Sequence, residues 1–189
     1  MNRSYLQKFQ IKDVVFLAIM SAVALATCAV MPLVISLQPL IFGISQLVTA
    51  LQIGVFFAIG LYKVRKPGSL LLMALMMGLI QLMMSPPMFL SSVLNGVLIE
   101  LIVLLLFRGY EKDGAVFCAA MLHTPLSLPF NYLYNRLIKG ADSPLAAVAD
   151  RAPLAAVGMT LAVVAVSALG ALIGIKIARE LKKSGVLKK

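Results

Sequence analysis

Two ionisable side chains stand inside apolar stretches, and they are the residues best placed to do chemistry. Glu100 follows "NGVLI" and His123 follows "AVFCAAML", so apolar residues precede both. An unpaired charge in hydrocarbon costs at least about 2.5–3.5 kcal/mol, so such groups usually pair or serve a function. Two interpretations stay open: a proton relay or ligand contact at the floor of a pocket, and a buried latch between two helices.

Further polar residues gather toward one end of the expected helices. At 1.5 Å of rise per residue, they lie within about 10 Å of the expected external surface, whereas the inner halves are nearly all apolar. A water-filled channel is polar along its whole length, so this one-sided pattern predicts a pocket open to the outside. With the two deeper residues included, the candidate substrate-binding residues are Gln46, Gln81, Asn95, Glu100, His123, Asn131, Tyr132 and Asn135.

No familiar catalytic or metal-binding motif accompanies these residues. The sequence has no G-x-x-x-x-G-K-[ST] phosphate loop, no G-x-S-x-G elbow and no H-E-x-x-H pair. A single histidine without a cysteine or histidine at ligand spacing gives no support for a metal site. Cys28 and Cys118 stand in apolar stretches, so we expect buried thiols and no disulfide. We therefore expect a protein that is not an enzyme.

The composition identifies the elements that must position these side chains. The chain is 61% hydrophobic and 13% charged, with a mean hydropathy of +1.00, whereas soluble domains are roughly a quarter charged. A membrane-spanning helix needs about 20 apolar residues. We predict an all-α integral membrane protein with a single transmembrane domain. Its six transmembrane helices are expected at roughly 13–36, 40–62, 68–84, 88–107, 114–135 and 154–178.

The basic residues predict the orientation in the lipid bilayer. The net charge is +10, but the 17 Lys and Arg residues stand between apolar stretches, so we expect no nucleic-acid partner. Fourteen of them fall at the chain ends or after the second and fourth helices. The positive-inside rule makes that side cytoplasmic, with both termini in the cytoplasm.

Two features mark the expected external side. Residues 136–153 form the longest segment between helices, and they can act as a lid or as a simple connector. Pro125 and Pro129 stand one turn apart before this segment. Because proline lacks the backbone N–H and crowds the preceding turn, we expect a kinked or unwound outer half in that helix.

Small residues recur every four positions in the first and last helices. The first strip, in "LAIMSAVALA", consists of Ala18, Ala22 and Ala26. The second strip consists of Gly170, Gly174 and Ala178. Residues at this spacing line one helix face and let another backbone come close. Each strip has two open roles, packing inside the chain or docking a second protein.

With these features, the chain resembles the substrate-binding S components of energy-coupling-factor (ECF) vitamin transporters. That family carries an A-x-x-x-A pattern in its first helix, which "AIMSAVALA" matches at Ala18 and Ala22, with Ala26 extending it. The resemblance implies a prokaryotic plasma-membrane protein that binds a vitamin or vitamin precursor near its outer face. It implies no covalently bound cofactor. It also implies docking of the alanine strip on the ECF scaffold transmembrane subunit, with ATP hydrolysed by partner ATPase subunits.

A closer likeness is to the S components for thiamine and its hydroxymethylpyrimidine precursor. In that group "RKPG", here residues 65–68, opens the third helix, and "NGVLIE", residues 95–100, stands where an amide-Gly-x-x-x-Glu pattern occurs. The chain has Asn95 in place of a glutamine and no tryptophan, which leaves tyrosines such as Tyr134 for aromatic stacking. Neutral amides, tyrosines and one carboxylate suit a small neutral or cationic heterocycle better than a polyanion.

Two other classes of function stay open. A stand-alone proton-coupled transporter would use Glu100 and His123, and its uptake would collapse with the proton gradient. An intramembrane enzyme or assembly factor would need neither a tightly bound vitamin nor an ATPase partner.

Overall fold

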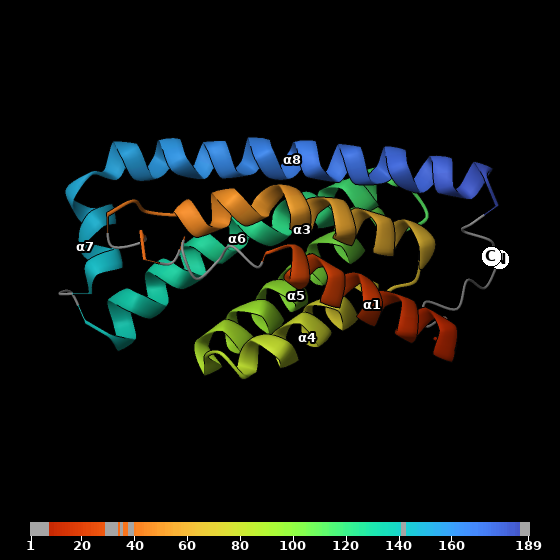
Figure 1. The fold of residues 1–189 in the computed structure, drawn as a ribbon, viewed down its shortest axis with the longest axis horizontal. Helices are drawn as coiled ribbons and strands as arrows, with labels where there is room; N and C mark the ends of the chain where they lie inside the picture. The colour runs from red at the N-terminus through yellow and green to blue at the C-terminus, as the bar shows by residue number, and fades with distance from the viewer. Residues whose placement is uncertain (1–7, 29–33, 35, 38–39, 141–142, 186–189) are drawn as a thin grey trace.

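Seven helices make up most of the chain that the structure describes (Figure 1). The computed structural model describes residues 8–28, 34, 36–37, 40–140 and 143–185 of the 189. The helices are α1 (Ile11–Thr27), α3 (Ile44–Lys63), α4 (Ser69–Leu82), α5 (Pro86–Phe107), α6 (Asp113–Ile138), α7 (Pro144–Arg151) and α8 (Pro153–Lys183). These ranges contain no strand, so the expected all-α class is confirmed.

The predicted ranges from 40–62 onward correspond to α3, α4, α5, α6 and α8, with ends that differ by a few residues, whereas α7 is not among the predicted helices and lies in the segment 136–153. The first range, 13–36, is too long, because α1 ends at Thr27 and Cys28 is its C-cap. The Cys28 backbone N–H donates to the carbonyl of Leu25 at 3.0 Å, which closes the last turn tightly. Residues 29–33 and 35 of the predicted range lie outside the described residues.

Not every helix is long enough to cross a bilayer by itself. Among the described residues, α3, α5 and α8 are long and apolar enough to span a membrane, and α4 is a shorter apolar helix. The count of six spans and the cytoplasmic placement of both termini stay predictions.

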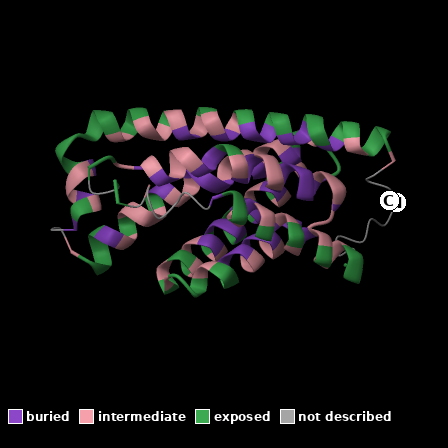
Figure 2. Ribbon diagram, in the orientation of Figure 1, coloured by how far each residue is buried: buried purple, intermediate pink, exposed green. Residues whose placement is uncertain are grey.

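An apolar cluster closes one half of the bundle. Its fully buried members include Leu17, Phe57, Met73, Ile99 and Val116, which α1, α3, α4, α5 and α6 contribute in that order. The cluster lies toward the α3–α4 and α5–α6 connections, and buried positions concentrate along the inner faces of the helices (Figure 2). This half of the molecule is therefore filled by side chains, and it holds the helices from which the opposite halves extend.

The glycine strip of α8 packs inside the chain. Figure 1 shows α8 along one side of the bundle with α3 beside it, and these two helices are in extensive contact. A Cβ atom added to Gly170 would lie 2.5 Å from the carbonyl oxygen of Leu51, and one added to Gly174 would clash with the carbonyl oxygen of Val55. Only glycine allows this approach, so the second strip serves helix packing.

The two prolines do not unwind α6, which stays helical from Asp113 to Ile138. Pro125 has no N–H to donate to the carbonyl of Met121, one turn earlier. The hydroxyl of Ser167 on α8 donates to that carbonyl at 2.7 Å. Of the two outcomes expected for the outer half, unwinding is therefore wrong, because a neighbouring helix supplies the missing hydrogen bond, and a kink stays a prediction.

The two cysteines are free thiols. Cys28 is buried, as expected, whereas Cys118 is only half-buried and not the buried thiol expected there.

The α3–α8 contact predicts opposite outcomes for one substitution at two glycines of α8. Gly170→Ala should lower the free energy of unfolding by about 1–3 kcal/mol, because its Cβ overlaps the α3 backbone. Gly158→Ala should leave it unchanged or raise it by up to about 1 kcal/mol, because a Cβ there meets no atom within 4 Å and alanine favours helix. Thermal unfolding in detergent measures both. Equal midpoints for the two variants would contradict this packing.

Candidate functional site

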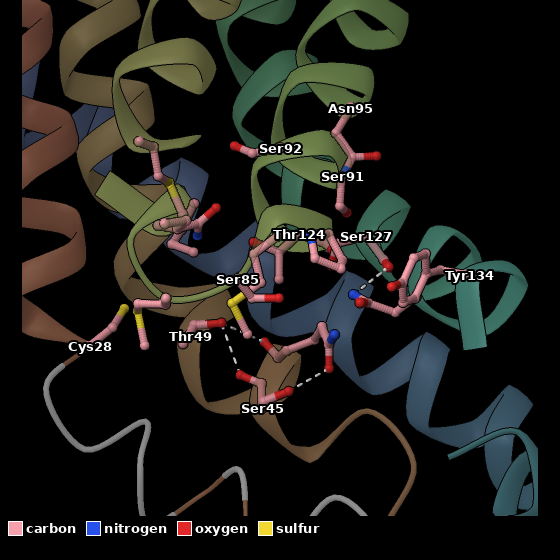
Figure 3. Close-up of a pocket in the computed structure, with 18 of the residues that line it drawn as sticks. Cys28, Ser45, Thr49, Ser85, Ser91, Ser92, Asn95, Thr124, Ser127 and Tyr134 are labelled. Atoms are coloured by element: carbon pink, nitrogen blue, oxygen red, sulfur yellow. Dashed lines mark hydrogen bonds between the residues drawn. The ribbon is translucent and has the colours of Figure 1, made fainter. Parts of the chain in front are cut away.

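A cavity of about 1040 Å³ opens between the halves of the helices that lie away from the apolar cluster (Figure 3). Residues of α1, α3, α4, α5, α6 and α7 line it. It takes in six of the eight candidate substrate-binding residues. These are Gln46, Gln81, Asn95, His123, Asn131 and Asn135. The predicted one-ended polar pocket is therefore present, whereas Glu100 and Tyr132 do not line it.

Sequence reasoning missed the hydroxyl groups of this cavity. The lining also contains Ser45, Thr49, Ser85, Ser91, Ser92, Thr124, Ser127 and Ser143. A signal was present, because Thr124, Ser127, Asn131 and Asn135 recur at three- and four-residue spacing and so share one face of α6. Several of these groups bond within their own helix. Ser127 Oγ donates to the carbonyl of Thr124 at 2.7 Å, and Asn131 Nδ2 donates to the carbonyl of Ser127 at 2.8 Å.

Glu100 forms its hydrogen bonds in the closed half of the bundle, and its side chain does not line the cavity. Its carboxylate accepts hydrogen bonds from the backbone N–H of Gly68 at 2.6 Å, from that of Leu71 at 3.4 Å and from the hydroxyl of Tyr110 at 2.9 Å. It therefore caps the first turn of α4, where free N–H groups and the helix dipole favour a negative charge. The prediction of Glu100 as a substrate-binding residue paired with His123 is wrong. The alternative of a latch between Glu100 and His123 is not formed either, because both ring nitrogens of His123 lack a hydrogen-bond partner and Glu100 joins α5 to the start of α4 instead.

This cap explains why "RKPG" and "NGVLIE" occur together. Gly68 is the N-cap of α4 with φ at +90°, a left-handed conformation that favours glycine and directs its N–H to Glu100. Burial and the neighbouring Glu100 carboxylate raise the pKa of Tyr110 well above its ordinary value, so its hydroxyl stays a donor. Gly68 and Glu100 thus join the two motifs away from the cavity, whereas Asn95, the first residue of "NGVLIE", lines the cavity.

Three buried groups in the cavity have no protein partner. Asn95 Oδ1, Thr124 Oγ1 and both ring nitrogens of His123 form no hydrogen bond with the described residues. These side chains belong to residues that are only 1%, 3% and 4% exposed, respectively. The His123 ring packs against Phe57, with 4.5 Å between the ring centroids. Buried polar atoms are nearly always bonded in native proteins, so this cluster indicates a place for a ligand or water.

α7 packs against α6 and α8 of the bundle. Ser143 Oγ donates to Asn135 Oδ1 at 2.9 Å, and Pro144 and Leu145 line the cavity. Away from the cavity, the Tyr132 hydroxyl donates to Asp150 Oδ1 at 2.8 Å. The expectation that Tyr132 lines the pocket is wrong, because its helical position directs it to α7, and Tyr134 takes that place.

The alanine strip of α1 is not fully buried against other helices among the described residues. Ala18 is half-buried, whereas Ala22 and Ala26 are exposed. Ala22 and Ala26 also form part of the cavity wall. The buried face of α1 is a different one, made by Leu17, Ser21 and Ala24.

The described residues contain no group of three or more His, Cys, Asp or Glu side chains that could hold a metal ion.

The chain belongs to a family described as a hypothetical bacterial integral membrane protein (Trep_Strep), whose model matches residues 11–183. It is a multi-pass protein of the bacterial plasma membrane, as the apolar helices led us to expect. No curated protein matches the sequence. The fold is similar to a crystal structure described as an S-component of an ECF transporter. The TM-score is 0.64 and the sequences are 21% identical, over 95% of this chain and 89% of that one.

The Glu100 cap predicts a loss of stability without a loss of binding. Both carboxylate oxygens face donors, so Glu100→Gln places an NH₂ group against an N–H or O–H donor. We expect the free energy of unfolding to fall by about 1.5–3 kcal/mol. Glu180→Gln, which removes an exposed pair with Lys183, is the control and should change it by less than about 0.5 kcal/mol. Thermal unfolding and ligand binding are measured together. If Glu100→Gln had a normal melting temperature but no longer bound the ligand, Glu100 would be a binding residue and this account of the cap would be contradicted.

Proposed function

We propose that the chain is the substrate-capture subunit, or S component, of an ECF-type importer. The observation that carries this proposal is the combination of two features in one molecule. The fold is similar to an S-component over 95% of the chain, and a cavity with polar walls lies in one half of a bundle whose other half is closed. A closed inner half suits a protein that holds a molecule and cannot conduct it alone, so a capture subunit agrees better with this geometry than an enzyme or a channel.

The proposal places the cavity at the external surface. In the six-span topology, the α3–α4 and α5–α6 connections and both termini lie in the cytoplasm, where the positive-inside rule puts the basic residues. The cavity lies at the opposite ends of these helices, beside the α4–α5 connection and α7. The ligand would then enter from outside, and the segment 136–153 would form part of the rim.

Energy for uptake would come from other subunits. The chain has no phosphate loop, so ATP would be hydrolysed by partner ATPase subunits, joined to this chain through an ECF scaffold transmembrane subunit. We propose the strip of Ala18, Ala22 and Ala26 on α1 as the docking surface. Its support is the exposure of Ala22 and Ala26, which leaves a flat face for another helix.

The ligand would be a small, vitamin-like molecule. The likeness to thiamine-related S components rests on "RKPG" and "NGVLIE", and these motifs meet at the α4 cap through Gly68 and Glu100, while Asn95 is their one residue in the cavity lining. Five of the six residues of "NGVLIE" and all of "RKPG" therefore support the fold of the closed half, and Asn95 is the residue of these motifs that could contact a ligand.

Uptake into proteoliposomes tests the proposal. The chain is reconstituted with and without an ECF module from a bacterium that encodes both, and a labelled panel of vitamins and precursors is supplied outside. Uptake that needs the module and internal ATP, and that survives collapse of the proton gradient, is the expected result. Uptake by the chain alone that stops with the proton gradient would favour the proton-coupled alternative and contradict the proposal.

If the alanine strip is the docking surface, a substitution in it should disrupt docking on the ECF module without changing ligand affinity. Ala18→Leu should abolish co-purification with the ECF module, because leucine prevents close helix contact, while ligand affinity stays unchanged. Ala18 is chosen because Ala22 and Ala26 border the cavity. Ala165→Leu is the matched control, since it places the same side chain at an exposed alanine of α8. Unchanged co-purification of Ala18→Leu would contradict docking on this strip.

A further inference from the structure

Three cations gather around one tyrosine where α3 and α8 end. The centroid of the Tyr62 ring lies 4.1 Å from the guanidinium carbon of Arg65 and 5.9 Å from Lys182 Nζ. Arg179, one turn before Lys182 on α8, joins this group because Asp113 accepts hydrogen bonds from both arginines. Figure 1 shows α3 and α8 running side by side to the same end of the bundle. We call Tyr62, Arg65, Arg179 and Lys182 the Tyr62 cluster.

Positive charge exceeds negative charge in this cluster. Among the described residues, Asp113 is the carboxylate that pairs with its cations, and it is shared between the two arginines. The Lys182 side chain forms no ion pair or hydrogen bond with a described residue. Its neighbour Lys183 differs, because it pairs with Glu180 at 2.7 Å. The cluster therefore keeps uncompensated positive charge beside an aromatic ring, an arrangement that attracts an anion.

The Tyr62 cluster lies where two helices leave the hydrocarbon of the membrane. Tyr62 is the last residue of the span predicted at 40–62, and Arg179 follows the span predicted at 154–178. Tyrosine is common at this depth, and arginine and lysine side chains extend from it toward the headgroups. Ile177, just before the cluster on α8, is 40% exposed, so acyl chains can contact it. A phospholipid beside α8 thus places its phosphate at the level of the cluster.

We propose that the Tyr62 cluster binds the phosphate group of an anionic ligand, for which a phospholipid headgroup and a soluble phosphate are the two sources. Guanidinium and ammonium groups are the usual protein donors to phosphate, and basic pockets between transmembrane helices bind anionic headgroups. The cluster does not line the cavity. The inference therefore goes beyond the capture function and does not depend on it.

The residues of the cluster have different roles in this site. Lys182 is the direct donor, because its ammonium group has no other partner among the described residues. Arg65 is a positioning residue, since its guanidinium donates to the carbonyls of Tyr62 and Glu111 and to Asp113. Arg65 is the first residue of "RKPG", so this motif contributes to the phosphate site as well as to the α4 cap.

The test measures lipid binding to the full chain after delipidation in detergent. Phosphatidylglycerol, whose headgroup is negatively charged, is compared with phosphatidylcholine of the same acyl chains, whose headgroup is neutral overall. Native mass spectrometry follows the bound lipid across a titration and gives a dissociation constant for each lipid. We expect phosphatidylglycerol to bind about tenfold more tightly, because the choline group repels the cations of the cluster.

Two adjacent lysines of α8 show whether the lipid binds at the cluster. Lys182→Gln should weaken phosphatidylglycerol binding by about fivefold, the usual effect of one basic residue at an anionic headgroup. Lys183→Gln is the matched control, because it removes the same charge from a side chain that already pairs with Glu180. It should change binding by less than about twofold. Both lysines are exposed, so both variants should melt like the wild type in phosphatidylcholine.

Inorganic phosphate separates the two sources of the anion. It is added to the delipidated protein at constant ionic strength, with chloride as the reference. A rise in melting temperature that Lys182→Gln abolishes would identify soluble phosphate as a ligand of the cluster. Phosphatidylglycerol binding that depends on Lys182 and that phosphate does not displace would identify the lipid as the ligand.

Two outcomes would overturn the inference. The first is equal affinity for the two lipids together with no response to inorganic phosphate that depends on Lys182. The second is an equal loss of binding in Lys182→Gln and Lys183→Gln, which would indicate attraction to the overall positive charge and no defined site. Neither outcome bears on the capture function, because the cluster lies outside the cavity and module-dependent uptake tests that function separately.

Discussion

The structure depends on one buried carboxylate. Glu100 is only 6% exposed in an apolar protein, where a carboxylate persists only if its oxygens are bonded. Its donors come from the first turn of α4 and from Tyr110 in the α5–α6 connection. One side chain on α5 therefore fixes two further segments at the closed end. The arrangement of α4, α5 and α6 toward the cavity follows from this joint.

Because the closed half of the bundle is stable, the half with the cavity can contain buried polar atoms that have no hydrogen-bond partner. The apolar cluster and the glycine contact between α3 and α8 hold the bundle without help from the polar residues of the cavity. The cavity can then keep polar atoms on Asn95, His123 and Thr124 that have no protein partner. Buried groups of this kind lower stability, so a protein keeps them where they serve a function. In the proposed capture subunit, the ligand supplies the missing partners.

The sequence predicts the helices and the position of the cavity, but it does not predict several of the contacts between helices. Long apolar runs define the helices, and the depth of the amides along them predicts a cavity at one end, because rise per residue converts position into depth. The partner of Glu100 could not be predicted from the sequence. Gly68 donates its backbone N–H, and because nearly every residue type has such a group, the amino-acid types give no sign of this hydrogen bond. Helical position alone could not choose between Tyr132 and Tyr134, because a turn of 100° per residue puts them at equal angles on either side of the face of Asn131 and Asn135. The continuity of α6 depended on Ser167, which is distant in sequence from Pro125.

The central claim is that the cavity holds a small molecule. Mass spectrometry of compounds released from the purified, detergent-solubilised protein tests it most directly, with protein denatured by heat and protein washed at high detergent as comparisons. The account predicts one compound in stoichiometric amount that raises the melting temperature when it is added back. A protein that releases nothing, and that no member of a vitamin and precursor panel stabilises, would contradict it.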